Sequence, residues 1–357
     1  MKSSTLLLAF SATWALAPLA VAQKAAAPVD LGTLGGSYST ANAVGTTTDV
    51  VVGGANVFTD AYQHAVYTNS LEYLEDLGSL IGVYGNSVAG GISSKGAITG
   101  TSDQIIDSEG DIASHAFYFV SSRTGMVDLG TNGGTLAEGN ATQNANVVGA
   151  STVAGDVAYT AFVWTSAKGM INLNTLAGDG GLDGYNSYAF GVNTKGLAVG
   201  SSDSPDGTTH AVAWILKTGA IKDLLTLGGS YAQALAVNDS NMAVGFSTLV
   251  GDAQTDAFEG SPGGGGLHDI GNLGGSYAQA NGVNDSGVVV GSSNITGDTD
   301  VHAFVWTQAG GIVDLNTLPG LAGSAFVELN SANAIAADGT IVGVGLAQDG
   351  QYHAFAW

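Results

Sequence analysis

An internal repeat runs through this sequence and limits, more than any other feature, what the chain can fold into. Residues 266–277 (GLHDIGNLGGSY) are echoed by residues 30–38 (DLGTLGGSY) and 223–231 (DLLTLGGSY). Weaker copies begin at Asp76, Asp128, Asn172 and Asp314. The apolar residue that follows recurs at spacings of 44 to 52 residues, at Leu31, Leu77, Leu129, Leu173, Leu224, Ile270 and Leu315. The chain therefore holds seven copies of one unit.

Each copy contains four short apolar runs separated by turn residues. In the sixth copy these runs are residues 278–284, 288–291, 302–306 and 311–315, and Asp285-Ser286-Gly287 forms the first tight turn. Such runs indicate strands. A four-stranded unit of about 45 residues is typical of a β-propeller blade. We therefore predict an all-β, seven-bladed β-propeller of four-stranded blades over residues 29–357.

The two ends of the repeat array complement each other. The first copy opens with only a fourth-strand sequence, residues 29–31, and the last copy ends on its third strand, residues 352–357. Pairing of these segments would leave no open sheet edge between the first and last blades. We expect the N-terminal strand to close the last blade.

The N-terminal 22 residues are typical of an export signal. Lys2 precedes an apolar stretch over residues 6–19, and Ala20-Val21-Ala22 forms a small-residue cleavage site before Gln23. An uncleaved membrane anchor is the alternative, although Thr13 and Pro18 interrupt the stretch. We expect a secreted or periplasmic protein whose mature chain begins near Gln23 with a short lead, residues 23–28, and contains no membrane span.

The charge and the cysteine content limit the kinds of ligand and partner that the chain can bind. The chain has 30 acidic and 8 basic residues, a formal net charge of −22 and no cysteine. Nucleic-acid binding depends on clustered Lys and Arg, so we expect no nucleic-acid partner. The acidity suits a soluble, self-repelling monomer or a protein that holds cations. Disulfides and cysteine-ligated metals are excluded.

Several polar and aromatic residues keep one repeat position, which indicates structural roles. The histidines are expected to be hydrogen-bonded inside the blade, and the tryptophans, which follow on the same strand face, to fill the space between blades. These positions are His64, His115, His210, His302, His353, Trp164, Trp214, Trp306 and Trp357.

Aspartates recur in two positions. One set lies four residues before each histidine position, at Asp60, Asp111, Asp156, Asp206, Asp252, Asp298 and Asp349. The other set lies in the fourth strand, at Asp30, Asp76, Asp128, Asp223, Asp269 and Asp314. We expect both sets to accept hydrogen bonds from backbone amides just ahead of them in a turn.

Insertions concentrate in two classes of loop that leave the same face of a four-stranded blade. They are residues 103–111, 178–185 and 319–328, and repeated tyrosines lie in the same loops. Binding residues commonly lie in loops on a rigid scaffold. We predict a ligand-binding face carrying Tyr38, Tyr185, Tyr231, Tyr277, Asp107, Asp179 and Asp183. A Ca²⁺ site is a further possibility, at Asp107, Glu109, Asp111, Asp179 and Asp183.

The sequence contains no recognisable catalytic motif. It lacks a nucleophile elbow, a zinc-protease motif and a phosphate loop with lysine. Two functions remain open. The first is a secreted binding or scaffold module for an extracellular glycan, protein or cation. The alternative is a polysaccharide hydrolase or lyase that uses acidic residues of the same loops.

A recurrent His-Ala-Phe tripeptide gives the sequence a family resemblance. It occurs at residues 115–117, 302–304 and 353–355, together with the Asp-Leu-Gly-Thr-Leu-Gly-Gly and Val-Asn-Asp-Ser-Gly stretches. With these motifs the chain resembles the extracellular HAF-repeat proteins over essentially residues 30–357. The resemblance implies an exported bacterial protein and no particular reaction. Departures from the tripeptide occur at Val66, Thr160, Val212 and Asp256.

Overall fold

The strands of this computed structural model fall into antiparallel groups that follow the repeat. The structure describes residues 27–45, 50–68, 71, 73–178 and 185–357. Sheet A contains β2 (Gly35–Val44), β3 (Val51–Val57), β4 (Gln63–Tyr67) and β5 (Glu75–Gly78). Sheet B contains β6 (Ser87–Ile92), β7 (Ile98–Ile105), β8 (Ile112–Phe119) and β9 (Met126–Asp128). Sheet C contains β10 (Gly133–Gln143), β11 (Asn146–Val153), β12 (Tyr159–Thr165) and β13 (Gly169–Asn172).

The second half of the chain repeats this arrangement. Sheet D contains β14 (Ser187–Val192), β15 (Leu197–Asp203), β16 (Thr209–Ile215) and β17 (Ala220–Leu225). Sheet E contains β18 (Gly228–Val237), β19 (Ala243–Leu249), β20 (Thr255–Gly260) and β21 (Leu267–Gly271). Sheet F contains β22 (Gly274–Val283), β23 (Val289–Ile295), β24 (Val301–Thr307) and β25 (Gly311–Asp314). Sheet G contains β26 (Phe326–Ile335), β27 (Ile341–Ala347), β28 (Tyr352–Ala356) and β1 (Val29–Asp30).

Sheet G joins the two ends of the described chain. Strand β1 pairs antiparallel with β28, so that Val29 lies opposite Ala356 and Asp30 opposite Phe355. The Leu31 amide donates to the Ala354 carbonyl oxygen over 3.0 Å. The Leu31 side chain is 2% exposed. Strand β1 thus pairs with the third strand of sheet G in the same way as the fourth strand pairs with the third strand in sheets A to F.

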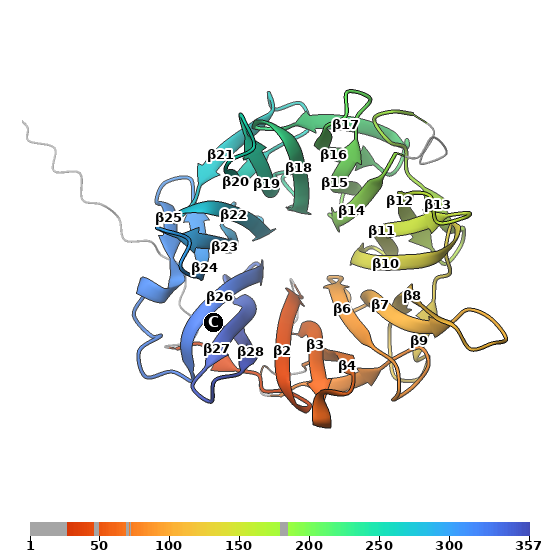
Figure 1. Cartoon of the computed structure of the whole chain (residues 1–357), viewed down its shortest axis with the longest axis horizontal. Helices are drawn as coiled ribbons and strands as arrows, with labels where there is room; N and C mark the ends of the chain where they lie inside the picture. The colour runs from red at the N-terminus through yellow and green to blue at the C-terminus, as the bar shows by residue number, and fades with distance from the viewer. Residues whose placement is uncertain (1–26, 46–49, 69–70, 72, 179–184) are drawn as a thin grey trace, which may run out of the picture.

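The sheets are arranged in a ring, with the first strand of each sheet nearest the centre (Figure 1). At three junctions a first strand also makes a single parallel pair with the third strand of the preceding sheet. The paired residues are Thr209 with Tyr231, Thr255 with Tyr277, and Tyr352 with Tyr38. These pairs fix neighbouring sheets at the end of the ring where each first strand begins.

The core lies within and between the sheets, and small residues let the strands approach each other. The third-strand phenylalanines Phe117, Phe162, Phe258, Phe304 and Phe355 are fully buried. Beside them, a glycine recurs in the second strand where the first strand bulges. A Cβ atom on Gly291 would lie 2.0 Å from the Gln279 carbonyl oxygen, and one on Gly149 would lie 1.8 Å from that of Glu138. The bulge therefore requires the glycine of the recurrent Val-Val-Gly sequence, because a side chain there would clash with the first strand.

The only helices in the described residues are two short 3₁₀ turns, η1 (Phe58–Asp60) and η2 (Leu315–Thr317). Across that same part of the chain, no helix has the length and apolar character needed to span a lipid bilayer.

Candidate functional site

Four of the aspartates that precede the histidine position connect two segments of their own sheet. Their side chains accept backbone N–H bonds of 2.7 Å from the start of the first strand of the same sheet, 21 to 23 residues earlier. The pairs are Asp60 with Ser37, Asp156 with Thr135, Asp252 with Ser230, and Asp298 with Ser276. The expectation that these four bond amides just ahead of them is wrong, because the register of the first two strands brings an earlier segment closer.

Two aspartates of this set make the expected turn. Asp206 and Asp349 bond amides two residues ahead, at Thr208 and Gln351. Each aspartate of the fourth strand does the same, as Asp76 does with the Gly78 amide over 2.6 Å.

The repeated histidines bond these fourth-strand aspartates. The Nδ1 atom of each ring lies 2.7 to 3.0 Å from a carboxylate oxygen. The pairs are His64 with Asp76, His115 with Asp128, His210 with Asp223, His302 with Asp314, and His353 with Asp30. The last pair links β28 to β1. Hydrogen bonding inside the sheet is the role expected of these histidines, although their partners were not identified from sequence.

The repeated tryptophans pack between sheets. Trp214 is fully buried, and its Nε1 donates to the Asn174 carbonyl oxygen over 2.7 Å. Trp164, Trp306 and Trp357 are partly buried against core clusters.

Of the residues predicted to bind a ligand or Ca²⁺, Asp179 and Asp183 lie outside the described residues. Tyr185 is half-buried. The Asp107 carboxylate bonds its own loop, since it accepts from the Glu109 amide over 3.1 Å and from the Asp111 amide over 2.9 Å. These hydrogen bonds stabilise the turn of the loop. They do not test Ca²⁺ binding, so the Ca²⁺ site stays a prediction.

Two of the predicted tyrosines belong to an aromatic cluster on sheets E and F. The Phe246 ring in β19 lies 6.0 Å from the Tyr231 ring and 5.9 Å from the Tyr277 ring, measured between centroids. Tyr231 is 37% exposed and Tyr277 is 36% exposed. Tyr38 keeps the equivalent position in sheet A and is half-buried. We call Tyr231, Phe246 and Tyr277 the aromatic platform.

A second aromatic group lies on sheets C and D. Tyr188 stacks on Tyr159 at 5.3 Å and on Phe190 at 6.1 Å. Burial, with the charges of nearby groups that include Tyr159, Glu138 and Tyr231, raises the pKa of Tyr188 to about 12. These rings and Phe246 do not keep a repeat position, so nothing in the periodicity pointed to them.

Polar side chains continue from the platform along the inner strands. The Tyr277 hydroxyl donates to the Gln279 Oε1 over 2.7 Å, and Gln279 Nε2 donates to Asn281 Oδ1 over 2.9 Å. In sheet E the direction is reversed, because Gln233 Nε2 donates to the Tyr231 hydroxyl oxygen. On sheet C, burial raises the pKa of Glu138, which an Asn140 hydrogen bond partly offsets. Amides, hydroxyls and a carboxyl therefore lie beside exposed aromatic faces.

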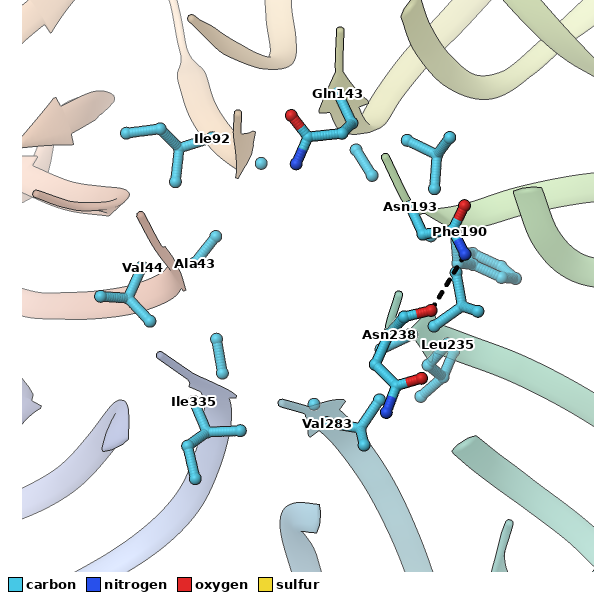
Figure 2. A pocket seen from close by; sticks show the side chains of 18 of the residues that line it. Ala43, Val44, Ile92, Gln143, Phe190, Asn193, Leu235, Asn238, Val283 and Ile335 are labelled. Carbon is cyan, nitrogen blue, oxygen red and sulfur yellow. Dashed lines mark hydrogen bonds between the residues drawn. The ribbon is translucent and has the colours of Figure 1, made fainter. Parts of the chain in front are cut away.

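The opposite ends of the inner strands surround an axial cavity of about 250 Å³. Figure 2 shows Val44, Ile92, Val283 and Ile335 around it. None of the described residues that were predicted to bind a ligand lines this cavity. The short first turns of the sheets lie at this end.

Asparagines that line this cavity connect neighbouring sheets. Each donates its side-chain amide to a backbone carbonyl of the next sheet over 2.9 to 3.1 Å. The pairs are Asn42 with Ala89, Asn140 with Ala189, Asn281 with Ala332, and Asn333 with Ala41. Because their donors are used in this way, we assign these residues a structural role.

Comparison with known proteins supports the fold alone. No protein-family model and no curated protein matches the chain. The β-propeller domain of the trilobed protease from Pyrococcus furiosus, described as having an open velcro topology, aligns with a TM-score of 0.52 and 10% identity, over 90% of this chain and 95% of that one. A puromycin hydrolase aligns with a TM-score of 0.51 and 11% identity, over 90% of this chain and half of that one. The chain is all-β and structurally similar to β-propellers.

Proposed function

We propose that the chain is a seven-bladed β-propeller whose last blade is closed by the N-terminal strand. The seven sequence copies, the pairing of β1 with β28, and the bond from Asn333 to the Ala41 carbonyl oxygen support this reading. The HAF-repeat motifs and the export signal in residues 1–22 support placing it among secreted or periplasmic proteins.

We further propose that it is a binding module for an extracellular polysaccharide. The observation that carries this is the aromatic platform, in which two half-exposed tyrosines flank Phe246 beside Gln233 and Gln279. Sugar rings present C–H faces that pack on aromatic rings and hydroxyls that bond amides. Aromatic side chains with one wet end are suited to such amphipathic ligands.

The test compares two tyrosine variants on opposite ends of the ring. Binding of the mature chain to a panel of soluble polysaccharides is measured by affinity electrophoresis. Tyr231→Ala with Tyr277→Ala should weaken binding at least about fivefold, because two aromatic contacts of about 0.5–1.5 kcal/mol each are lost. Tyr73→Ala, which removes a 63% exposed ring between β4 and β5 at the other end, should leave binding unchanged.

Equal affinities for wild type and the platform variant would overturn the proposal, as would a binding loss shared by Tyr73→Ala. Product analysis in the same samples separates binding from catalysis. New reducing ends or unsaturated products that disappear in Glu138→Gln would instead support a hydrolase or lyase.

A further inference from the structure

One of the repeated histidines has surroundings that the others lack. Across the described residues, Asp300, His302 and Glu328 each offer a metal-ligating atom within 4.8 Å of the other two. His302 lies in β24, Asp300 immediately precedes that strand, and Glu328 comes from β26 of the next sheet. The three side chains therefore converge at the junction of sheets F and G.

Each of the three side chains is oriented by a separate hydrogen bond. His302 Nδ1 lies 2.7 Å from Asp314 Oδ2, which leaves Nε2 as the nitrogen that can bind a metal. Asp300 Oδ1 accepts from the Val301 amide over 2.9 Å, and Glu328 Oε1 accepts from Asn330. A second-shell carboxylate on histidine is the usual arrangement at protein metal sites, because it fixes the ring and its tautomer.

Electrostatics in this group favour a bound cation. The ligating oxygens of Asp300 and Glu328 lie within 4.8 Å of each other, and Glu328 is half-buried. Two carboxylates so close together repel each other unless a proton or a cation lies between them. The His302 side chain is 18% exposed, so the group remains open to solvent ions.

The equivalent positions in other repeats serve as internal comparisons. The residue two before the histidine is Tyr62, Ala113, Thr208 or Gln351 elsewhere, and Asp300 only here. In sheet D, the Thr208 hydroxyl instead bonds His210 Nε2 over 2.9 Å. The carboxylates are thus specific to the sixth repeat and its neighbour, and the shared fold does not require them.

We propose that Asp300, His302 and Glu328 bind a divalent transition-metal ion of the Zn²⁺ class, with water completing the coordination. One imidazole nitrogen with two carboxylate oxygens suits Zn²⁺, whereas Ca²⁺ takes six to eight oxygen ligands. This site is separate from the aromatic platform and does not depend on the polysaccharide proposal.

Isothermal titration of the metal-free mature chain with ZnCl₂ tests the site. We expect one saturable site per chain, and at least tenfold weaker binding in Asp300→Asn and in Glu328→Gln. Both substitutions keep side-chain shape and spare the His302–Asp314 pair. Glu75→Gln is the matched control, since it removes a half-buried carboxylate from β5 of sheet A, and should bind Zn²⁺ like wild type.

Cobalt substitution supplies an independent readout. The visible d–d absorption of Co²⁺ on the wild-type chain should be lost in Glu328→Gln and kept in Glu75→Gln. The proposal is overturned if no saturable binding occurs, if Asp300→Asn and Glu328→Gln bind like wild type, or if Glu75→Gln alone loses binding.

Discussion

At the scale of single residues, the repeated aspartates have a structural role although their side chains are exposed. Asp60, Asp156, Asp252 and Asp298 all have positive φ, between 54° and 56°, a conformation that Asp and Asn tolerate better than most residues. Their hydrogen bonds lower the pKa of each carboxyl below 3.8, the Ser37 amide first for Asp60 and the Thr248 hydroxyl first for Asp252. Each one holds the loop between the second and third strands to the start of the first strand.

These lowered pKa values predict acid sensitivity. A carboxyl whose pKa is lower in the folded state stabilises that state above its unfolded pKa, and the contribution is lost as the pH falls through the folded pKa. We therefore expect the thermal unfolding midpoint to drop as the pH falls below 3.8. Replacing the four aspartates with asparagine should flatten that part of the curve, measured by circular dichroism. A curve of unchanged slope in the fourfold variant would contradict the assignment.

The histidine pairs show what sequence periodicity can and cannot predict. The repeat marked His64 and Asp76 as structural, because both recur at fixed positions. Their partnership depends on the register between β4 and β5, where a bulge lies between the Ala65 and Val66 pairings. That bulge has no signature in the residue types alone, so the pairing could not be read in advance.

At the scale of elements, β1 is the shortest of the described strands, and it joins the two ends of the described chain. It consists of Val29 and Asp30, and it brings Leu31 into a cluster with Ala354 and Ala356 of β28 and with Ala41 of β2. The Asp30 carboxylate also bonds His353 over 2.9 Å. Two paired residues, one hydrogen bond between side chains and one buried side chain therefore connect the two ends of the described chain.

Leu31→Ala should destabilise the protein by about 2–5 kcal/mol, because it leaves a cavity under the closing strand. Urea unfolding followed by tryptophan fluorescence measures the change. Val29→Ala is the control, since the Val29 side chain is 40% exposed and its loss should cost about 0.5 kcal/mol or less. If Leu31→Ala lowers the free energy of unfolding as little as Val29→Ala does, β1 adds little to the stability of sheet G.

The four-strand unit could be predicted closely from sequence, whereas the aromatic groups could be predicted only in part. Strand positions follow from apolar runs bounded by turn residues, which is why 288–291 anticipates β23 (Val289–Ile295). Tyr231 and Tyr277 were identified because they repeat. Phe246, Tyr159 and Tyr188 were missed because each occupies a position held by other residue types in neighbouring repeats. Only the three-dimensional packing brings Phe246 beside Tyr231 and Tyr277, and Tyr159 beside Tyr188.

At the scale of the whole molecule, the net charge of −22 opposes the hydrogen bonds that connect neighbouring sheets of the ring. Asparagine bonds from sheet A to B, C to D, F to G and G to A are all directed toward the next sheet. With 30 acidic and 8 basic residues, electrostatic repulsion opposes these contacts.

Screening this repulsion should stabilise the folded state. Raising NaCl from 10 to 200 mM shortens the Debye length from about 30 Å to below about 10 Å. We expect the thermal midpoint at pH 7 to rise by a few degrees, and KCl to act like NaCl. Differential scanning fluorimetry measures both. A midpoint that falls or stays constant would mean that self-repulsion is not a large term in stability.

The pairing of β1 with β28 has a consequence for how the protein is made. Synthesis runs from the N-terminus, so β1 is the first of the described strands to be translated and β28 is the last. Asp30 and His353, which bond each other, are 323 residues apart. Strand β1 cannot form its pairing with β28 until β28 has been translated. A nascent chain that lacks β28 therefore cannot form this pairing.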